Sequence, residues 1–194
     1  MVRAKPPLKS STQSQVSIIA GRWRGRKLPV ANIDGLRPTG GRIRETLFNW
    51  LMNDIAGARV LDLFSGAGGL GLEGLSRGAS ELTMIERHPL AAQQLRDNLK
   101  QLDANGANVI TSDAIHWLSQ PATAPFDIVF IDPPFSQDLW QSSFDKLAVG
   151  GYLQTGSAVY VECERSRTLA VPPNWRLHRD KSAGKVSFKL YYVD

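Results

Sequence analysis

One stretch decides the fold: Arg59-Val60-Leu61-Asp62-Leu63-Phe64-Ser65-Gly66-Ala67-Gly68-Gly69-Leu70-Gly71. Residues 59–64 are apolar enough for a buried strand, and residues 66–71 match the pattern Gly-x-Gly-x-x-Gly at the start of a helix. Glycines in such a turn permit positive φ angles and let a ligand approach the backbone N–H groups closely. A strand, a glycine-rich turn and a helix in this order predict a ligand-binding α/β unit; the alternative is a turn that binds nothing.

Strands and helices alternate along the rest of the chain. We expect further strands at residues 81–86, 108–111, 126–131 and 158–163, and helices at residues 69–77, 89–102, 114–119 and 139–147. In the helix at 89–102, Pro89 suits the first position, and Leu90, Leu95, Leu99 and Leu102 form the expected apolar stripe. Residues 176–179 and 186–193 resemble a closing hairpin. The pattern predicts an α/β fold with a mostly parallel seven-stranded sheet, an antiparallel C-terminal hairpin and helices on both faces.

The N-terminal part has a different composition from the rest. Residues 1–15 are rich in Lys, Pro, Ser, Thr and Gln, and we expect a disordered basic tail. Residues 16–38 form a basic extension, with a short strand or hairpin between residues 16 and 30. The main domain then spans residues 39–194 and begins with a helix at about residues 39–53, for which Thr39 is the expected N-cap.

Charge is distributed unevenly along the chain. Residues 1–44 contain ten Lys or Arg residues and one acid, whereas residues 45–194 contain thirteen basic and seventeen acidic residues. A cationic arm on a slightly acidic body indicates a polyanionic partner, most often a nucleic acid. A solubilising tail would explain residues 1–15 alone. It explains residues 22–27 less well, because there Trp23 lies among closely spaced cations, a mixture suited to phosphate contact and base stacking.

Several classes of protein are excluded by composition. No apolar run is long enough to span a bilayer, and the basic N-terminus lacks the apolar core of a signal peptide. The single cysteine, Cys163, excludes an intrachain disulfide and a cysteine-cluster metal site. The three histidines, His88, His116 and His178, have no metal-site spacing. We therefore expect a cytoplasmic protein, a monomer, with neither a metal nor a membrane partner.

Three acids follow successive predicted strands. Asp62, Glu86 and Asp113 would meet at the carboxyl edge of the sheet, where α/β proteins bind ligands. Glu86 is well placed for the ribose of a dinucleotide, but Asp62 would lie where a pyrophosphate requires positive potential. S-adenosylmethionine, a cationic ligand without phosphate, fits the three acids better. Asp62 and the turn would hold its amino-acid end, Glu86 its ribose and Asp113 its adenine amine. The predicted cofactor-binding residues are Asp62, Phe64, Ser65, Gly66, Gly68, Glu86, Arg87, Asp113 and Ala114.

The stretch Asp132-Pro133-Pro134-Phe135 follows the predicted strand at residues 126–131. Prolines cannot donate to a sheet ladder, so the strand must stop there and leave Asp132 and Phe135 at its rim. Taken alone, these four residues are more typical of a strand end with a Pro-Pro turn. Opposite the glycine turn and the three acids, they instead favour a clamp for a planar amine. The predicted catalytic residues are Asp132, Pro133, Pro134 and Phe135.

The chain resembles the class I S-adenosylmethionine-dependent methyltransferases. Residues 132–135 match the (Asp/Asn)-Pro-Pro-(Phe/Tyr) motif of the enzymes that act on exocyclic amines of nucleobases. Residues 36–39 and 42–49 resemble the N-terminal signature of the RsmD family, and residues 25–28, 62–66 and 184–191 are also similar. Gly40-Gly41 departs from the Thr-Asp type of pair that is more frequent in the family.

The resemblance implies a Rossmann-like class I methyltransferase fold and methyl transfer to a guanine N2 of 16S ribosomal RNA. By resemblance the target is guanine 966 in an assembled 30S subunit. Asp132 and the Pro133 carbonyl would accept hydrogen bonds from the two N2–H groups, and Phe135 would stack on the base. The expected RNA contacts are Arg22, Trp23, Arg24, Arg26, Arg37, Arg42 and Arg44.

Three other functions are compatible with parts of the sequence. The glycine pattern alone would suit an NAD(P)-dependent oxidoreductase, but Asp62 and the Pro-Pro clamp argue against one. An RNA-binding module with an inactive cofactor fold is a second possibility, and the intact clamp at residues 132–135 argues against it. Adenine-N6 methylation of DNA is the third, since the same clamp serves either amine.

Overall fold

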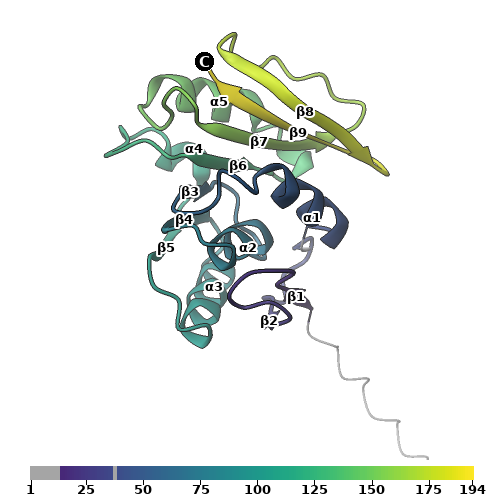
Figure 1. Ribbon diagram of the computed structural model, residues 1–194, viewed down its shortest axis with the longest axis vertical. Helices are drawn as coiled ribbons and strands as arrows, with labels where there is room; N and C mark the ends of the chain where they lie inside the picture. Colours follow the sequence, from purple (N-terminus) through teal and green to yellow (C-terminus); the bar gives the residue numbers. More distant parts are fainter. Residues whose placement is uncertain (1–13, 37–38) are drawn as a thin grey trace, which may run out of the picture.

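The computed structural model describes residues 14–36 and 39–194, and a single twisted sheet of seven strands runs through its middle (Figure 1). The strand order is β5-β4-β3-β6-β7-β9-β8, in which the first five strands are mutually parallel and β9 is antiparallel to both of its neighbours. The predicted parallel sheet with an antiparallel C-terminal hairpin is confirmed. The strands are β3 (Arg59–Asp62), β4 (Glu81–Glu86), β5 (Ala107–Thr111), β6 (Ile128–Ile131), β7 (Ala158–Glu164), β8 (Trp175–Ala183) and β9 (Val186–Val193).

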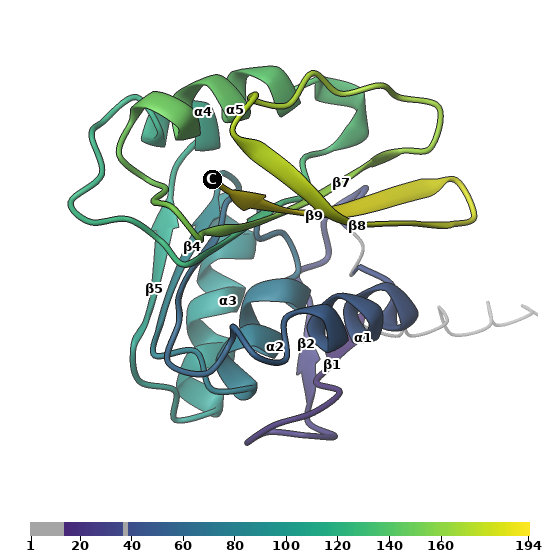
Figure 2. The ribbon, with the colours of Figure 1, turned by 45° about the horizontal axis from the view of Figure 1, so that its top comes forward.

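Helices cover both faces of this sheet (Figure 2). On one face lie α1 (Gly41–Trp50), α2 (Gly69–Ser76) and α3 (Pro89–Gln101), and on the other lie α4 (Ala114–Trp117) and α5 (Trp140–Val149). Side chains alternate along each strand, so the first face buries Val60 and Phe130 and the second buries Leu61 and Val129. None of the helices in the described ranges is long and apolar enough to cross a membrane.

The apolar stripe of α3 differs from the prediction at one position. Leu95, Leu99 and Leu102 are buried, but Leu90 is 66% exposed. Five residues separate Leu90 from Leu95, which turns it well away from the stripe at 3.6 residues per turn. Ala91 and Ala92 are buried in its place.

The basic extension forms the expected hairpin and packs onto the main domain. Strand β1 (Gln15–Ser17) pairs with β2 (Lys27–Pro29) in antiparallel register. Val16 and Leu28 are buried in the same core as Leu47 and Phe48 of α1. The hairpin and the main domain therefore share one hydrophobic core. Most of the predicted disordered tail, residues 1–13, lies outside the described residues.

Helix α1 is shorter than the helix predicted at residues 39–53. It begins after Gly40, whose extended backbone occupies the N-cap position without a side-chain hydrogen bond, and it ends at Trp50, with Leu51 as its C-cap. The expected cap, Thr39, lies one residue too early. Its hydroxyl instead donates to Oδ2 of Asp132 at 3.3 Å. The helix start is therefore coupled to the end of strand β6.

Candidate functional site

A cavity of about 860 Å³ opens at the carboxyl ends of the parallel strands. From β3 the chain proceeds through β4 to β5 at one side of the sheet, and then returns through β6 to β7 on the other side. The reversal between β3 and β6 is a topological switch point, where α/β proteins bind ligands. The cavity is within the size range of small-molecule sites. Its wall includes the ends of all five parallel strands, the start of α1 and residues 33–36.

The glycine turn forms the floor of the cavity between β3 and α2. Gly66 and Gly68 have φ angles of +49° and +79°, in the left-handed region that favours glycine. A Cβ atom on Gly66 would lie 3.2 Å from the Leu36 side chain, and one on Gly68 would lie 2.5 Å from Leu95. The sequence requirement for glycine is therefore both conformational and steric.

Asp62 lies under this turn and is almost completely buried. Its Oδ2 accepts a hydrogen bond from the Gly71 amide at 2.9 Å, and its backbone carbonyl accepts one from the Ser65 hydroxyl at 2.9 Å. Burial raises the pKa of Asp62 to about 7, and the nearby charges of Asp132 and Glu86 act in the same direction. Asp62 therefore fixes the turn as well as lining the cavity.

Glu86, at the end of β4, binds two backbone amides. Its Oε2 accepts from Gly66 N at 2.9 Å and its Oε1 accepts from His88 N at 2.7 Å. These bonds hold the glycine turn against the neighbouring strand end. The carboxylate keeps further lone pairs for a ligand in the cavity.

The other predicted cofactor residues also line the cavity. Asp113 is exposed, and its Oδ1 accepts from His116 N at 2.9 Å, which caps α4. Arg87 is exposed and donates from Nη1 to the Gln137 side chain at 2.9 Å. The strand ends thus bring together all nine residues that we predicted for a cofactor, namely Asp62, Phe64, Ser65, Gly66, Glu86, Arg87, Asp113 and Ala114 in the cavity wall, and Gly68 at the N-cap of α2.

Residues 132–135 line the same cavity, and Asp132 lies close enough to Asp62 for its charge to raise the pKa of that acid. Pro133 is buried, and Phe135 begins a short 3₁₀ helix, η1 (Phe135–Gln137), with its ring centroid 5.7 Å from that of Trp140. Burial raises the pKa of Asp132 to about 6, although the hydrogen bond from Thr39 opposes the shift. Asp132 therefore titrates close to neutrality and is ionised above that range.

Two further polar residues of this wall were missed by sequence reasoning. Glu162 on β7 is 3% exposed and lines the cavity, and its Oε1 accepts a hydrogen bond from the Tyr160 hydroxyl at 2.7 Å. The sequence did contain a pattern that could have indicated Glu162 as a site residue, because it is an acid near the carboxyl end of an otherwise apolar strand. Thr39 was noted only as a helix cap.

The predicted RNA contacts fall into three groups. Arg22, Arg24 and Arg26 are exposed in the loop of the β1–β2 hairpin, and Arg42 is exposed on α1 beside the cavity. Arg37 lies outside the described residues. The structure does not support the predicted RNA contacts of Trp23 and Arg44, because these residues are only 8% and 5% exposed. Neither is accessible enough to stack on a base or contact a phosphate.

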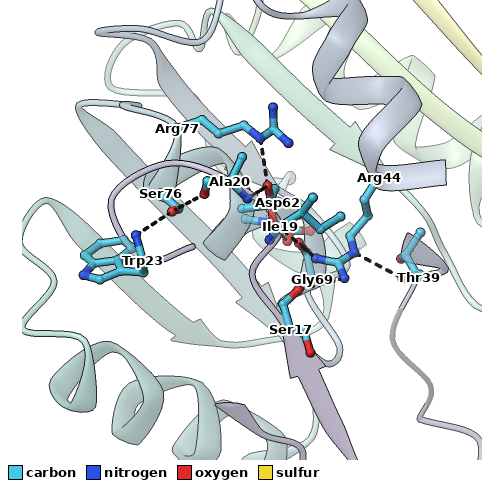
Figure 3. A network of polar contacts seen from close by, with 12 residues as sticks. Ser17, Ile19, Ala20, Trp23, Thr39, Arg44, Asp62, Gly69, Ser76 and Arg77 are labelled. Atoms are coloured by element: carbon cyan, nitrogen blue, oxygen red, sulfur yellow. Dashed lines mark hydrogen bonds and ion pairs between the residues drawn. The ribbon is translucent and has the colours of Figure 1, made fainter. Parts of the chain in front are cut away.

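Arg44 belongs to an internal network centred on Glu73 of α2 (Figure 3). The Glu73 carboxylate accepts from Arg44 Nη1 at 3.4 Å and from Arg77 Nε at 2.7 Å. It also accepts from the amides of Ile19 and Ala20 at 2.8 and 3.0 Å. Burial holds the pKa of Arg44 below its usual value, although Glu73 opposes the shift.

A second contact holds the loop of the hairpin to the far end of α2. Trp23 donates from its amide to Ser76 Oγ at 3.1 Å, and the Ser76 hydroxyl donates to Ala20 O at 2.6 Å (Figure 3). Together with the Glu73 network, these bonds attach the basic hairpin to the C-terminal half of α2. The hairpin is therefore an integral part of the domain surface.

Comparison with known proteins identifies the family. A family model described as "Conserved hypothetical protein 95" matches residues 16–192. "Ribosomal RNA small subunit methyltransferase D" of Escherichia coli (strain K12) is 49% identical over 93% of this chain and 91% of its own. The protein of the same name from Haemophilus influenzae is 45% identical over 93% of this chain and 95% of its own. The solved structure of yhhF from Escherichia coli superposes with a TM-score of 0.85 at 48% identity, covering 93% of this chain and 99% of its own. The fold is Rossmann-like and of the class I methyltransferase type, and the chain belongs to the RsmD family of ribosomal RNA small subunit methyltransferases.

Proposed function

We propose that this protein transfers a methyl group from S-adenosylmethionine to the exocyclic N2 of a guanine in 16S ribosomal RNA. One observation carries the proposal: Asp132 and Phe135 line the same cavity as the glycine turn and the acids of β3, β4 and β5. An amine clamp and a cofactor site thus share one space. The names of the relatives, which specify small-subunit ribosomal RNA, support the choice of substrate.

The chemistry of the cavity wall fits S-adenosylmethionine. Its acids are suited to a cationic ligand with free hydroxyls and amines, and among the described residues the basic side chains that line it are Arg87 and His88. A pyrophosphate would find no cluster of cations there. Asp62 and the glycine turn would hold the amino-acid end, Glu86 the ribose and Asp113 with Ala114 the adenine.

The target amine requires help because its lone pair is delocalised into the guanine ring. In the proposed mechanism, ionised Asp132 accepts a hydrogen bond from one N2–H and the Pro133 carbonyl accepts one from the other. These two bonds favour a pyramidal nitrogen and direct its lone pair towards the cofactor side of the cavity. Phe135, supported by Trp140, stacks on the base.

S-adenosylmethionine, held by Asp62, Glu86 and the glycine turn, would supply a methyl group activated by its positively charged sulfur; the methyl–sulfur bond would break as N2 formed its new bond. Asp132 need not remove a proton before this step, because alkylation makes the nitrogen strongly acidic. Afterwards the excess proton on N2 passes to Asp132 and then to solvent. Thr39 keeps the Asp132 carboxylate oriented through its hydroxyl.

RNA would be held by exposed cations outside the cavity. Arg42 lies beside the cavity entrance, whereas Arg22, Arg24 and Arg26 lie near the C-terminal end of α2. That end is about 10 Å from the glycine turn, given a rise of about 1.5 Å per residue. Contacts at both places would position an RNA strand while its target base enters the cavity.

Labelled methyl transfer tests the proposal. The substrate is ribosomal RNA, naked or within 30S particles, from cells that lack the protein, and duplex DNA of mixed sequence serves as the comparison. We expect label in 16S RNA alone. Label in DNA would favour the adenine-N6 alternative, and no transfer to either would contradict the proposed activity.

A further inference from the structure

Glu162 is a buried carboxyl group in the base-binding wall that the mechanism above does not use. Strands β6 and β7 are paired so that Ile131 lies opposite Val161, which makes residues 132 and 162 neighbours beyond the last paired position. Phe130 and Tyr160, two residues earlier on each strand, belong to one core cluster. By the alternation of side chains, Asp132 and Glu162 project from the same face of the sheet.

The two carboxyl oxygens of Glu162 have different environments. Oε1 accepts from the Tyr160 hydroxyl at 2.7 Å. Among the described residues, no hydrogen bond engages Oε2. Because Glu162 lines the cavity and Tyr160 occupies Oε1, Oε2 is the carboxyl oxygen left to contact a bound base.

The charges around Glu162 favour its neutral form. Asp132 faces it from β6, and Asp62 and Glu86 lie farther along the same cavity wall on β3 and β4. Among the described residues, two basic groups of the packed elements are engaged by other acids: Arg44 of α1 by Glu73, and Lys189 of β9 by Asp180 at 3.2 Å.

These surroundings favour one proton on the pair formed by Asp132 and Glu162. Burial and the charge of Asp132 raise the pKa of Glu162 to about 8, with the Tyr160 hydrogen bond opposing the shift. Burial raises the pKa of Tyr160 well above its usual value, so the phenol stays a donor. Two neighbouring carboxyl groups with raised pKa values titrate as a pair, and near neutral pH they favour sharing one proton.

We infer that Glu162 contacts the target base directly, donating a hydrogen bond from Oε2–H to the ring nitrogen beside the amine that Asp132 holds. In guanine, N1 and N3 flank the carbon that carries N2; N1–H is a donor and N3 is an acceptor, so the Oε2–H group would pair with N3. Tyr160 is a positioning residue, because its hydroxyl fixes the rotation of the carboxyl group and leaves Oε2 directed at the base. This inference rests on the proposed function and adds a second recognition contact to it.

The pH dependence of kcat/KM between pH 6 and 9 tests the inference with five proteins. The kcat/KM of the wild-type protein should fall about tenfold between pH 7 and pH 9, because one group with a pKa of about 8 must stay protonated. Glu162→Gln keeps a donor that cannot ionise, so it should remain within about threefold of wild type at pH 7 and lose this alkaline decline. Tyr160→Phe should move the decline to higher pH, since the lost hydrogen bond stabilised the ionised carboxylate.

Glu164→Gln, an exposed acid on the same strand, is the matched control and should behave as wild type. Glu162→Ala should lower kcat/KM by about tenfold at pH 7, the effect of one lost hydrogen bond. Wild-type activity with the same alkaline decline in Glu162→Gln would overturn the inference while leaving the proposed function intact. An inactive wild-type protein would instead overturn the proposed function, and the base contact with it.

Discussion

At Asp132, burial and hydrogen bonding shift the pKa of the carboxyl group in opposite directions. Burial raises its pKa to about 6, and the Thr39 hydroxyl limits that rise by stabilising the ionised form. An ionised carboxylate accepts a hydrogen bond from an amine more strongly than a neutral carboxyl group does, so this balance keeps Asp132 functional at neutral pH. Burial, together with the charge of Asp132, raises the pKa of the neighbouring Glu162 to about 8.

The first prediction concerns Asp132 itself. Asp132→Ala should lower kcat at least about 100-fold, because the amine loses its main acceptor. The affinity for S-adenosylhomocysteine should change less than about threefold, since the cofactor residues lie on other strands. Single-turnover kinetics and titration calorimetry measure the two quantities. Turnover near the wild-type rate would exclude the clamp.

A second prediction follows from the raised pKa of Asp132. Wild-type kcat/KM should fall as the pH drops through about 6, because protonation removes the negative charge that makes Asp132 a strong acceptor. Asp132→Asn keeps an acceptor oxygen that does not titrate, so its low residual activity should lack this acid decline. Pre-steady-state rates between pH 5 and 7.5 provide the comparison. An identical acid decline in both proteins would assign it to another group.

Sequence reasoning correctly predicted that the acids at the strand ends lie together. It failed to predict the burial of a side chain whose partner is distant in sequence. Asp62, Glu86, Asp113 and Asp132 were predictable as neighbours because parallel strands end at one edge. The burial of Arg44 depends on Glu73, which lies 29 residues away in sequence. No local pattern carries that information, and an arginine in a basic region resembles a nucleic-acid contact.

At the scale of elements, helix α2 organises both the site and the arm. Its first turn supplies the Gly71 amide to Asp62, and Glu73 in its middle holds the hairpin and α1. Ser76 at its last turn holds the loop that carries the exposed arginines. The sequence predicted the helix from its apolar residues and glycine turn, but Glu73 is fully buried and lies within the predicted helix without a distinguishing local signal.

The third prediction tests this anchoring. Glu73→Gln should lower the free energy of unfolding by about 3 kcal/mol, because Arg44 loses its buried counter-charge. The matched control is Glu81→Gln, because Glu81 forms an exposed ion pair with Arg59 at 2.8 Å. This variant should lower the free energy of unfolding by less than about 1 kcal/mol. Urea denaturation measures both. Equal losses of unfolding free energy in the two variants would contradict the role of Glu73 as the buried partner that anchors Arg44 and the hairpin.

The fourth prediction concerns the exposed loop of the β1–β2 hairpin. Arg24→Ala should weaken RNA binding and reduce the slope of log K against log salt by about 1, the value for one lost phosphate contact. Arg176→Ala on β8 is the control, because Arg176 already pairs with Asp194 at 3.1 Å. Filter binding at several salt concentrations gives the slopes. An unchanged slope for Arg24→Ala would remove the loop from the RNA surface.

At the scale of the whole molecule, the cavity concentrates acids whose burial opposes folding at high pH. Asp62, Asp132 and Glu162 have pKa values raised to about 7, 6 and 8. Each group binds its proton more tightly when folded, so its stabilising contribution is complete below its unfolded pKa. That contribution is lost as the pH rises through the folded values. The ligand-free protein should therefore be more stable at pH 5 than at pH 8.5.

The fifth prediction uses a Glu162 variant to test the loss of stability at high pH. Glu162→Gln removes one of the three groups, so at pH 8.5 it should be more stable than wild type by at least about 1.4 kcal/mol, the equivalent of one pKa unit. At pH 4 the two proteins should unfold at similar urea concentrations, because the native carboxyl is then neutral in both. A stability difference that does not depend on pH would contradict the assignment.

The central claim is that the Asp132 wall and the acid wall form one site for a guanine amine. Mass spectrometry of nucleosides tests it most directly, using 16S RNA that the purified protein has methylated with deuterated methyl label. The account predicts labelled N2-methylguanosine from the wild-type protein and none from Asp132→Ala. Labelled N6-methyladenosine, or a ring-nitrogen or ribose methyl product, would contradict it.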